Sequence, residues 1–263
     1  MLLLTGDGAL ARGSLQYEAG LSPELPMTEQ LFHTDAYLRE FEATVTAVDG
    51  SAVALDRTAF YPGGGGQPCD VGELRSGGQT ARVTKVGRRE GEVWHELDGP
   101  VPALGTQVEG AIDWENRHAL MRTHTALHIL CGVIWRDFGA KVTGGNMAPL
   151  SARMDFELEA MSADFAERVE ALANAEVAAA RDIGVRFLPR EEVLAHPDLI
   201  RTKINLLPEG IPEVRVVDIA GLDVQADGGT HLANTKDVGR IRIVGHESKG
   251  RINKRLRMVV EDA

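Results

Sequence analysis

The sequence predicts an α+β fold in which a small β-barrel domain precedes a domain of mixed helices and strands. Three observations carry this prediction. Short strand patterns separated by turn residues fill the stretch 40–112. A long helical pattern follows directly, and the remaining chain contains further helical and strand-like stretches in separate runs. Separate runs of strands and helices are typical of α+β domains.

The composition is that of an ordinary globular protein. The chain has 263 residues, 43% hydrophobic and 25% charged, which suits one large domain or two modest ones. No apolar run approaches a membrane span, and two cysteines, Cys69 and Cys131, imply no disulfide framework. We therefore expect a cytoplasmic protein without membrane contacts. The net charge of −11 argues mildly against a phosphate-rich partner unless Lys and Arg gather locally.

The chain is expected to divide into three parts. Residues 1–26 are a Gly-, Ala- and Leu-bearing stretch without periodicity, so we expect a flexible leader. Met27 precedes the first ordered-looking sequence and is an alternative start of translation. A barrel domain over 27–112 and an α+β domain over 113–263 complete the predicted organisation.

The barrel domain is predicted from its strands. Residues 43–48 alternate between apolar and polar side chains. Asp49 and Gly50 then supply a turn, and residues 52–55 return as the second strand of a hairpin. Short strands at this spacing are typical of a small barrel. Further strands are expected over 81–86, 93–97 and 108–112.

The second domain is expected to begin with a long helix over 114–138. Asp113 is a suitable N-cap for it, and Gly139 is a suitable end. A second helix is predicted to begin after Ser162 and to stop at Gly184. The other expected elements are a short helix after Pro189 and strands over 153–158, 213–219, 240–244 and 251–260.

Two histidines in the long helix carry the strongest chemical signal. His124 and His128 are four residues apart, which places both imidazoles on one helical face within reach of a single metal ion. Metalloprotease helices use the same spacing, but Thr125 stands in place of their glutamate, which argues against a protease. Such a pair also arises by chance, and hydrogen-bonded core histidines are the competing interpretation.

A second pair far along the chain makes a shared metal site the preferred interpretation. Asp227 and His231 are again four residues apart and flank a Gly-Gly turn that lets the backbone fold tightly. Zinc favours tetrahedral sites of His, Cys and carboxylate ligands. A capping aspartate and a surface histidine on a loop are the competing interpretation of this pair. We predict one zinc ion per chain, with four ligands: His124, His128, Asp227 and His231.

At these residues the sequence resembles the second domain shared by AlaX proteins and the editing domains of alanyl-tRNA synthetases. That family carries a His-x-x-x-His helix and a later Cys-Gly-Gly-Thr-His turn. Residues 228–231 match the end of this turn, and Asp227 replaces the cysteine. Residues 60–68 resemble the family's glycine-rich motif. The resemblance covers residues 27–262, and the other matching segments follow in the family's order at 141–146, 152–156, 233–235 and 249–257.

The resemblance implies a medium-length AlaX protein, with a barrel followed by an α+β metal-binding editing domain. Because the chain has no room for an adenylate-forming domain, we expect it to act in trans. The expected activity is hydrolysis of mischarged tRNA(Ala), chiefly Ser-tRNA(Ala), with Gly-tRNA(Ala) as a second candidate. A tRNA-binding module with a structural zinc and a metallohydrolase of small esters are the alternatives. Both a catalytic and an orienting metal, and both a monomer and a dimer, are compatible with the sequence.

The resemblance also assigns roles within the expected site. Thr143 lies where the family places a polar residue in the amino-acid pocket, so we expect it to recognise the serine hydroxyl. Gln67 is expected to approach the reacting groups from the barrel, and Gly65 and Gly66 are expected to contact the substrate. Turn formation is the competing interpretation for the threonine and for the glycines.

Positive charge is concentrated near the C-terminus. Strand alternation is expected to place four residues on one face as a strip that contacts tRNA phosphates: Arg251, Asn253, Arg255 and Arg257. Arg122, beside the histidines of the helix, is expected to meet the terminal phosphates. An edge strand guarded by charge is the competing interpretation of the strip.

Overall fold

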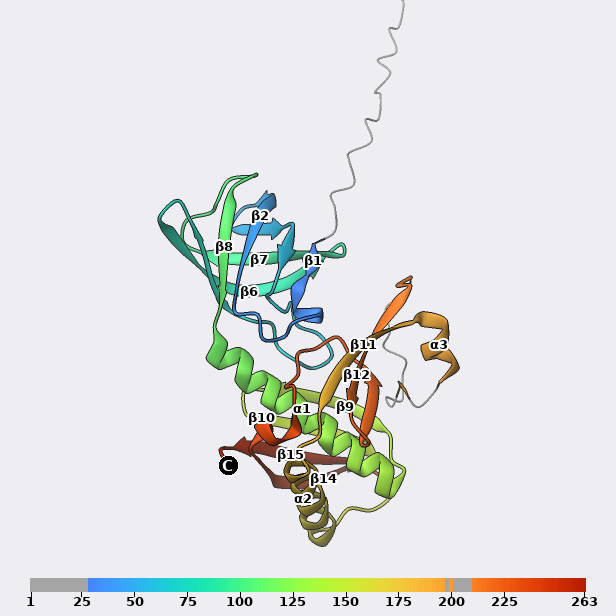
Figure 1. Cartoon of the computed structure of the whole chain (residues 1–263). Helices are drawn as coiled ribbons and strands as arrows, with labels where there is room; N and C mark the ends of the chain where they lie inside the picture. The colour runs from blue at the N-terminus through green and yellow to red at the C-terminus, as the bar shows by residue number, and fades with distance from the viewer. Residues whose placement is uncertain (1–27, 197–198, 201–209) are drawn as a thin grey trace, which may run out of the picture.

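A computed structural model of the chain describes residues 28–196, 199–200 and 210–263 (Figure 1). Within these residues the protein is mostly β-structure, with one closed six-stranded barrel and few helices. The leader predicted over 1–26 and the alternative start at Met27 lie outside the described residues. No helix in the described part of the chain is long and apolar enough to cross a membrane.

The barrel closes through antiparallel strands whose alternate side chains, such as Phe41 and Val45 on β2, fill its interior. The predicted hairpin is present, because Asp49 pairs with Ala52 and Gly50 adopts a φ of 59° that glycine accepts without steric cost. In hydrogen-bonded order the strands are β2 (Glu40–Asp49), β3 (Ala52–Leu55), β7 (Glu92–Asp98), β6 (Gln79–Arg89), β5 (Gly72–Ser76) and β8 (Gln107–Ile112).

A short segment precedes the barrel and lies beside it. The 3-10 helix η1 (Leu31–His33) follows directly after β1 and buries the side chain of Phe32. Two short strands pair in parallel here: β1 (Glu29–Gln30) and β4 (Arg57–Thr58).

The helix α1 (Trp114–Phe138) leads from the barrel into the rest of the molecule and has the predicted bounds (Figure 1). The Asp113 side chain accepts a hydrogen bond from the Asn116 N–H at 3.1 Å, which satisfies one of the free donors of the first turn. Gly139 ends the helix in the left-handed conformation, with a φ of 64°. The predicted apolar stripe is buried in a second core: Leu120, Leu127, Leu130 and Ile134.

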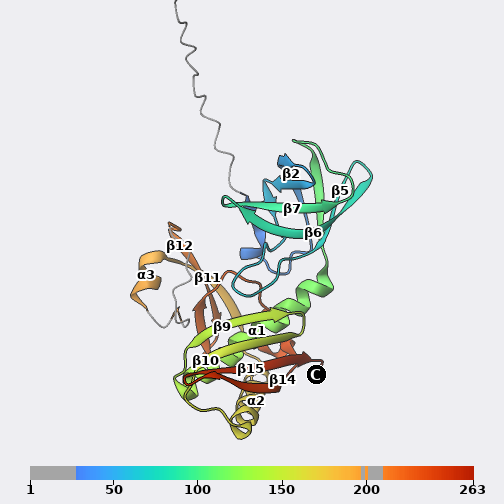
Figure 2. The same ribbon diagram turned by 180° about the vertical axis from the view of Figure 1, so that it is seen from behind.

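Two sheets and the helices α2 and η3 pack around α1, and Figure 2 shows the larger sheet lying across one side of it. This four-stranded sheet has the order β14 (Arg240–Gly250), β15 (Asn253–Glu261), β10 (Ser151–Glu157) and β9 (Val142–Ala148). The three-stranded sheet has the order β11 (Ile183–Pro189), β12 (Glu213–Ile219) and β13 (Asp223–Ala226). The helical elements are α2 (Ala163–Ala178), α3 (Arg190–Ala195) and the 3-10 helix η3 (Thr235–Val238).

The second helix ends earlier than predicted. α2 stops at Ala178, whereas the sequence predicted a helix that continues to Gly184. The chain turns through Ala179 and Ala180, the latter with a φ of 49°, and Gly184 lies in strand β11. The prediction was wrong because no glycine or proline marks the turn, so helical alanines continue through it without a stop signal.

The C-terminal strand also differs from its prediction. β14 extends to Gly250, and the turn of the β14–β15 hairpin holds Arg251 and Ile252. β15 therefore begins at Asn253, so Arg251 lies in a turn and not on the strand face predicted for it. The alternation predicted for the other three members of the strip is present, because Lys254 and Leu256 between them are buried.

Candidate metal centre

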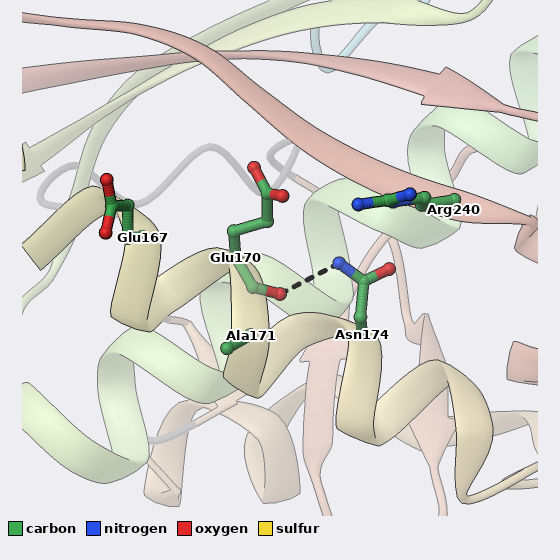
Figure 3. A pocket seen from close by; sticks show the side chains of 5 residues that line it. All are labelled: Glu167, Glu170, Ala171, Asn174 and Arg240. Atoms are coloured by element: carbon green, nitrogen blue, oxygen red, sulfur yellow. Dashed lines mark hydrogen bonds between the residues drawn. The ribbon is translucent and has the colours of Figure 1, made fainter. Parts of the chain in front are cut away.

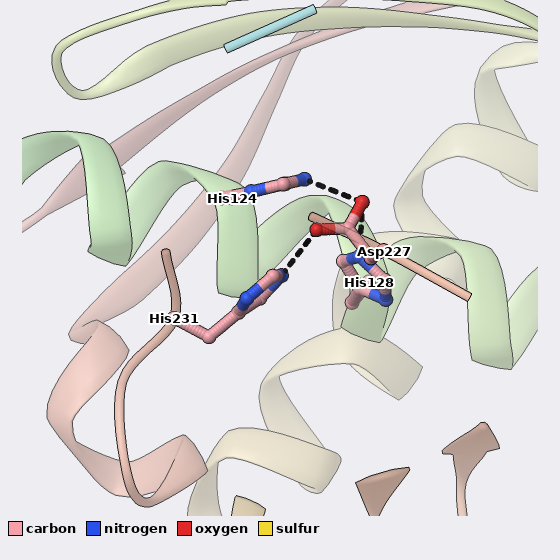
Figure 4. Close-up of side chains that lie close together, drawn as sticks. All are labelled: His124, His128, Asp227 and His231. Carbon is pink, nitrogen blue, oxygen red and sulfur yellow. Dashed lines mark ion pairs between the residues drawn. The ribbon is translucent and has the colours of Figure 1, made fainter. Parts of the chain in front are cut away.

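Four side chains from two distant segments converge into one cluster (Figure 4). His124 and His128 project from one face of α1, while Asp227 and His231 come from the loop that follows β13. One potential ligand atom from each residue can be chosen so that all four lie within 4.8 Å of one another. The two pairs that the sequence singled out therefore meet in space, as predicted.

The separations within the cluster suit a small metal ion. The Nε2 atoms of His124 and His128 lie 3.5 and 3.7 Å from Oδ2 of Asp227. Nε2 of His231 lies 3.7 Å from Oδ1 of the same carboxylate. Ligands bound tetrahedrally at about 2.0–2.2 Å from a zinc ion are roughly 3.3–3.6 Å apart. The nitrogen–oxygen separations are near this range, and the wider separations in the cluster, up to 4.8 Å, would shorten on binding. Asp227, 18% exposed, is the most exposed of the four and marks the accessible side of the cluster.

The other ring nitrogens of the helical histidines are held from outside the cluster. Nδ1 of His124 lies 3.0 Å from Oε1 of Gln67, and Nδ1 of His128 lies 2.9 Å from Oδ2 of Asp223. Because a carboxylate and an amide oxygen accept hydrogen bonds, each imidazole carries a proton on Nδ1. Nε2 of His124 then directs its lone pair inward, and Nε2 of His128 does so once that ring has lost its second proton. This is the tautomer that a metal ligand requires.

His231 is the residue whose surroundings fit a metal best. Both of its ring nitrogens are buried and have no hydrogen-bond partner. A buried polar atom without a partner costs roughly 1–3 kcal/mol, so such an atom normally has a ligand in the working protein. The unpartnered Nε2 faces the carboxylate of Asp227 together with the Nε2 atoms of the two helical histidines. The residues present therefore fit a bound cation.

The protonation states of three of the four groups are those that bind metals. Burial lowers the pKa of His124 to about 4, and burial and the neighbouring His124 hold the pKa of His231 well below its usual range. Burial raises the pKa of Asp227, but the surrounding histidines outweigh it and hold that pKa well below its usual range. Burial alone would lower the pKa of His128, but the hydrogen bonds with Asp223 and Asp227 outweigh the effect of burial and raise this pKa to about 9. Ligation by this residue requires loss of that proton.

The loop that carries Asp227 and His231 is shaped around the cluster. The Asp227 carboxylate accepts a hydrogen bond from the Gly229 N–H at 2.6 Å, which tightens the turn. A Cβ atom at Gly229 would collide with the ring of His124 and the amide of Gln67, so only glycine fits there. Behind the loop, the Leu232 N–H donates to the Thr125 hydroxyl at 3.1 Å. Thr125 is the residue that stands in place of the metalloprotease glutamate, and here it supports the ligand loop.

Gln67 joins the glycine-rich loop of the barrel to the cluster. This side chain is 3% exposed, and besides His124 it bonds to Thr230 at both ends of its amide. Its Nε2 donates to the Thr230 hydroxyl at 2.9 Å, and its Oε1 accepts from the Thr230 N–H at 3.1 Å. The expectation that Gln67 approaches the site from the barrel matches this position, and its contribution to catalysis stays a prediction.

The glycines before Gln67 lead the loop toward the edge strand β9. Gly65 and Gly66 have φ values of 58° and 91°, and both are exposed. The Gly66 carbonyl accepts a hydrogen bond from the Met147 N–H at 3.2 Å, which ties the loop to β9. Thr143 lies on the same strand, and its hydroxyl donates to Oδ1 of Asn253 at 2.9 Å. Substrate contacts of the two glycines and Thr143 stay predictions.

Three of the four arginines predicted to contact phosphates already have protein partners. The Arg122 guanidinium donates to the Val238 and Glu261 carbonyls at 2.8 Å each and pairs with Asp262, so it fastens the C-terminal segment. Arg255 forms a two-pronged pair with Asp155 at 2.7 and 2.8 Å. Arg257 pairs with Glu247 at 2.9 Å. These contacts hold the three side chains within the protein, and a phosphate contact of Arg251 in its exposed turn stays a prediction.

Sequence analysis missed the residues that hold the ligands from outside. Asp223 is buried behind His128, and Gln225 donates to its carboxylate at 2.7 Å. Arg215, also buried, donates to the carbonyls of His33 and Asp227 at 2.9 and 2.8 Å and so anchors the ligand loop. The one signal available was an acidic residue four positions before Asp227, which repeats the spacing of the two pairs.

A pocket elsewhere in the structure does not resemble a reaction site. It lies between α2 and β14 and is lined by Glu167, Glu170, Ala171, Asn174 and Arg240 (Figure 3). Its polar groups fasten the helix to the sheet. Oε2 of Glu170 accepts from the Ile243 N–H at 2.7 Å, and Asn174 bonds to both the N–H and the carbonyl of Ile241.

Comparison with known proteins gives matches along both parts of the chain. Residues 24–116 match the family model described as tRNA synthetases class II (A). Residues 214–257 match the model described as the threonyl and alanyl tRNA synthetase second additional domain. The second match includes Asp227 and His231, and the first includes Gln67 and the glycine-rich loop.

Whole proteins similar to this chain fall into two groups. The alanyl-tRNA editing protein AlaX-M of Saccharolobus solfataricus is 41% identical over 241 residues, covering 89% of this chain and 100% of that protein. The protein of the same name from Methanosarcina barkeri is 37% identical over 243 residues, covering 90% and 100%. The alanine–tRNA ligase of Pyrobaculum aerophilum is 40% identical over 228 residues, which are 84% of this chain and 25% of the ligase.

Proposed function

The chain belongs to the family of AlaX-M alanyl-tRNA editing proteins, and from this premise we propose that it hydrolyses the ester bond of mischarged tRNA(Ala) in the cytoplasm. The chief substrate in this proposal is Ser-tRNA(Ala), with Gly-tRNA(Ala) as a second. The observation that carries the proposal is the convergence of three histidines and one aspartate beside the glycine-rich loop. An editing hydrolase needs such a polar, shaped centre next to a pocket for the wrong amino acid.

The cluster is proposed to hold one zinc ion per chain. Three imidazole nitrogens and one carboxylate oxygen are a donor set that zinc accepts, and the unpartnered Nε2 of His231, which faces Asp227, supports the assignment. A bound zinc ion supplies positive charge that polarises an ester carbonyl or lowers the pKa of a water molecule. Asp227 is a harder donor than a thiolate, so we expect the site to accept other divalent ions more readily than a cysteine-containing site would.

The protein's own groups are proposed to orient the ester and the one water molecule that hydrolyses it. Gln67 and Asp223 hold the rings of His124 and His128, so the cluster needs no rearrangement when substrate binds. Gln67 also spans the barrel loop and the ligand loop, so an ester that enters between them meets its amide. The cluster is closed except at Asp227, which limits solvent access to the carboxylate side.

The amino-acid pocket is proposed to lie between the glycine-rich loop and β9. Gly65 and Gly66 would form one wall and Thr143 the other, since Met147 on the same strand bonds to the Gly66 carbonyl. The Thr143 hydroxyl is oriented by Asn253 and would recognise the hydroxyl of a misattached serine. Alanine would leave the acceptor side of the Thr143 hydroxyl without a partner, and sites of this kind discriminate against a substrate that lacks the matching group.

The two parts of the chain are proposed to act as domains with different tasks. The barrel domain over 27–112 would present the glycine-rich loop, and the domain over 113–263 would supply all four metal ligands. Arg251 in the β14–β15 turn remains the candidate for a tRNA phosphate contact. Phosphate contacts of this kind position a nucleic acid without reading its sequence.

One assay separates this function from the alternatives. The wild type, His231→Ala and the exposed-histidine control His246→Ala are incubated with Ser-, Gly- and Ala-tRNA(Ala), with and without a chelator. We expect selective loss of serine that the chelator and His231→Ala abolish and that His246→Ala leaves unchanged. Binding without hydrolysis would indicate a tRNA-binding module, and equal cleavage of all three esters would indicate a general esterase. Either result contradicts the proposal.

A further inference from the structure

Strand β11 presents an exposed apolar strip beside the metal cluster. Val185, Phe187 and Pro189 alternate along the strand, so their side chains point to the same face, and all three are exposed. Phe187 is 44% exposed and is the one phenylalanine or tryptophan exposed among the residues that the structure describes. β11 is an edge strand that pairs with β12 alone in the described sheets. Covering such a ring with a ligand removes apolar surface from water, which is favourable.

The register of the sheet places this ring in one row with a metal ligand. Phe187 pairs with Arg215 across β11 and β12. The last pair of β12 and β13 is Val216 with Ala226, and the next position along places Arg215 opposite Asp227. The Asp227 N–H donates to the Arg215 carbonyl at 3.1 Å, which continues the pairing. Residues directly opposite each other in an antiparallel sheet project to the same face. The backbone of Phe187 therefore lies two strand spacings, about 10 Å, from the backbone of the ligand.

We propose that Phe187 is a stacking platform for the terminal base of the tRNA acceptor end. The inference rests on the proposed function, because it concerns the substrate of that same site. The ribose that carries the ester also carries the terminal base, so the base lies within one nucleotide of the reacting carbonyl. Asp227 is the most exposed ligand, and the row that begins there passes the buried Arg215 and ends at the exposed Phe187.

Stacking suits an unpaired base at this place. Aromatic rings hold single-stranded bases through their flat faces, in a way that does not depend on base pairing. The opposite face of the sheet offers no equivalent, because Val214 and Val216 there are covered by Val193 of α3. Leu194, on the same short helix, is 48% exposed and provides a control of similar exposure and size away from the row.

The experiment compares two serylated acceptor-stem minihelices of tRNA(Ala), one ending in adenosine and one ending in an abasic ribose. Each is hydrolysed by the wild type, Phe187→Ala, Phe187→Trp and Leu194→Ala. We expect the wild type to prefer the adenosine end by about tenfold or more in kcat/KM, chiefly through KM. Phe187→Ala should lose this preference while its rate on the abasic end stays unchanged. Phe187→Trp and Leu194→Ala should keep it.

Three results would overturn the platform. A wild type without any preference for the adenosine end would contradict it, and so would Phe187→Ala with the full preference. An equal loss of kcat/KM on both minihelices in Phe187→Ala would also contradict it, because the substitution would then disturb the reaction site and not a contact with the terminal base. A wild type that hydrolyses neither minihelix would overturn the proposed function itself, so the two failures are distinguishable.

Discussion

The histidines of the cluster owe their orientation to side chains that never reach its centre. Gln67 comes from the barrel, and Asp223 comes from the start of β13, yet each fixes the Nδ1 proton of one helical histidine. Carboxylate and amide partners of this kind set both the tautomer and the angle of the ring. Asp223 is 1% exposed and also receives Gln225, so its carboxylate is fully embedded.

At this scale we predict that Asp223→Ala weakens metal binding without removing a ligand. The change deprives Nδ1 of His128 of its acceptor, and the loss of such a partner typically lowers metal affinity by about 10- to 100-fold. Competition with a chromogenic chelator measures the zinc affinity directly. Asp223→Asn retains an acceptor oxygen and should recover most of the affinity. Equal affinity of the wild type and Asp223→Ala would contradict a positioning role.

At the scale of elements, α1 connects the barrel to the metal ligands. Its first turn is fastened by Arg117, which is fully buried and pairs with both oxygens of the equally buried Asp70. The same guanidinium donates to the Ala36 carbonyl at 2.9 Å and the Ala59 carbonyl at 2.6 Å. Two turns further along the same helix lies His124. The anchor therefore sets the position of the helical ligands relative to the barrel loop.

The anchor gives a stability prediction for this element. Arg117→Ala leaves the Asp70 carboxylate buried and unpaired, and loss of one member of a buried pair costs about 3–5 kcal/mol. Urea unfolding followed by circular dichroism measures the change. Arg186→Ala is the matched control, because its pair with Asp218 is exposed and such pairs contribute little. Similar midpoints for the wild type and Arg117→Ala would contradict the anchor.

At the scale of the whole molecule, local signals predicted the structure well where they were complete. Asp113 and Gly139 define both ends of α1 because a capping side chain and a left-handed glycine act within one turn. The end of α2 carries no such signal, and the helix prediction ran on to Gly184. Strand β5 was also missed, because Leu74 is its one buried residue and alternation over so short a strand is weak.

The metal cluster likewise had a part that the sequence could predict and a part that it could not. The ligand pairs could be predicted because four-residue spacing and a Gly-Gly turn are visible in the chain itself. The contacts of Asp223 and Arg215 could not, because each depends on a partner brought close only by the packed fold. Charge patterning was a poor guide for Arg122 and Arg255, since the acidic partners that engage them are distant in sequence.

The central claim is that two distant segments of the chain close around one zinc ion. X-ray diffraction from crystals of the zinc-loaded protein, recorded just above and just below the zinc absorption edge, tests it most directly. We predict one anomalous difference peak per chain, lying among His124, His128, Asp227 and His231 and present only above the edge. A fully ordered cluster without a peak, or a peak held by other residues, would contradict the account.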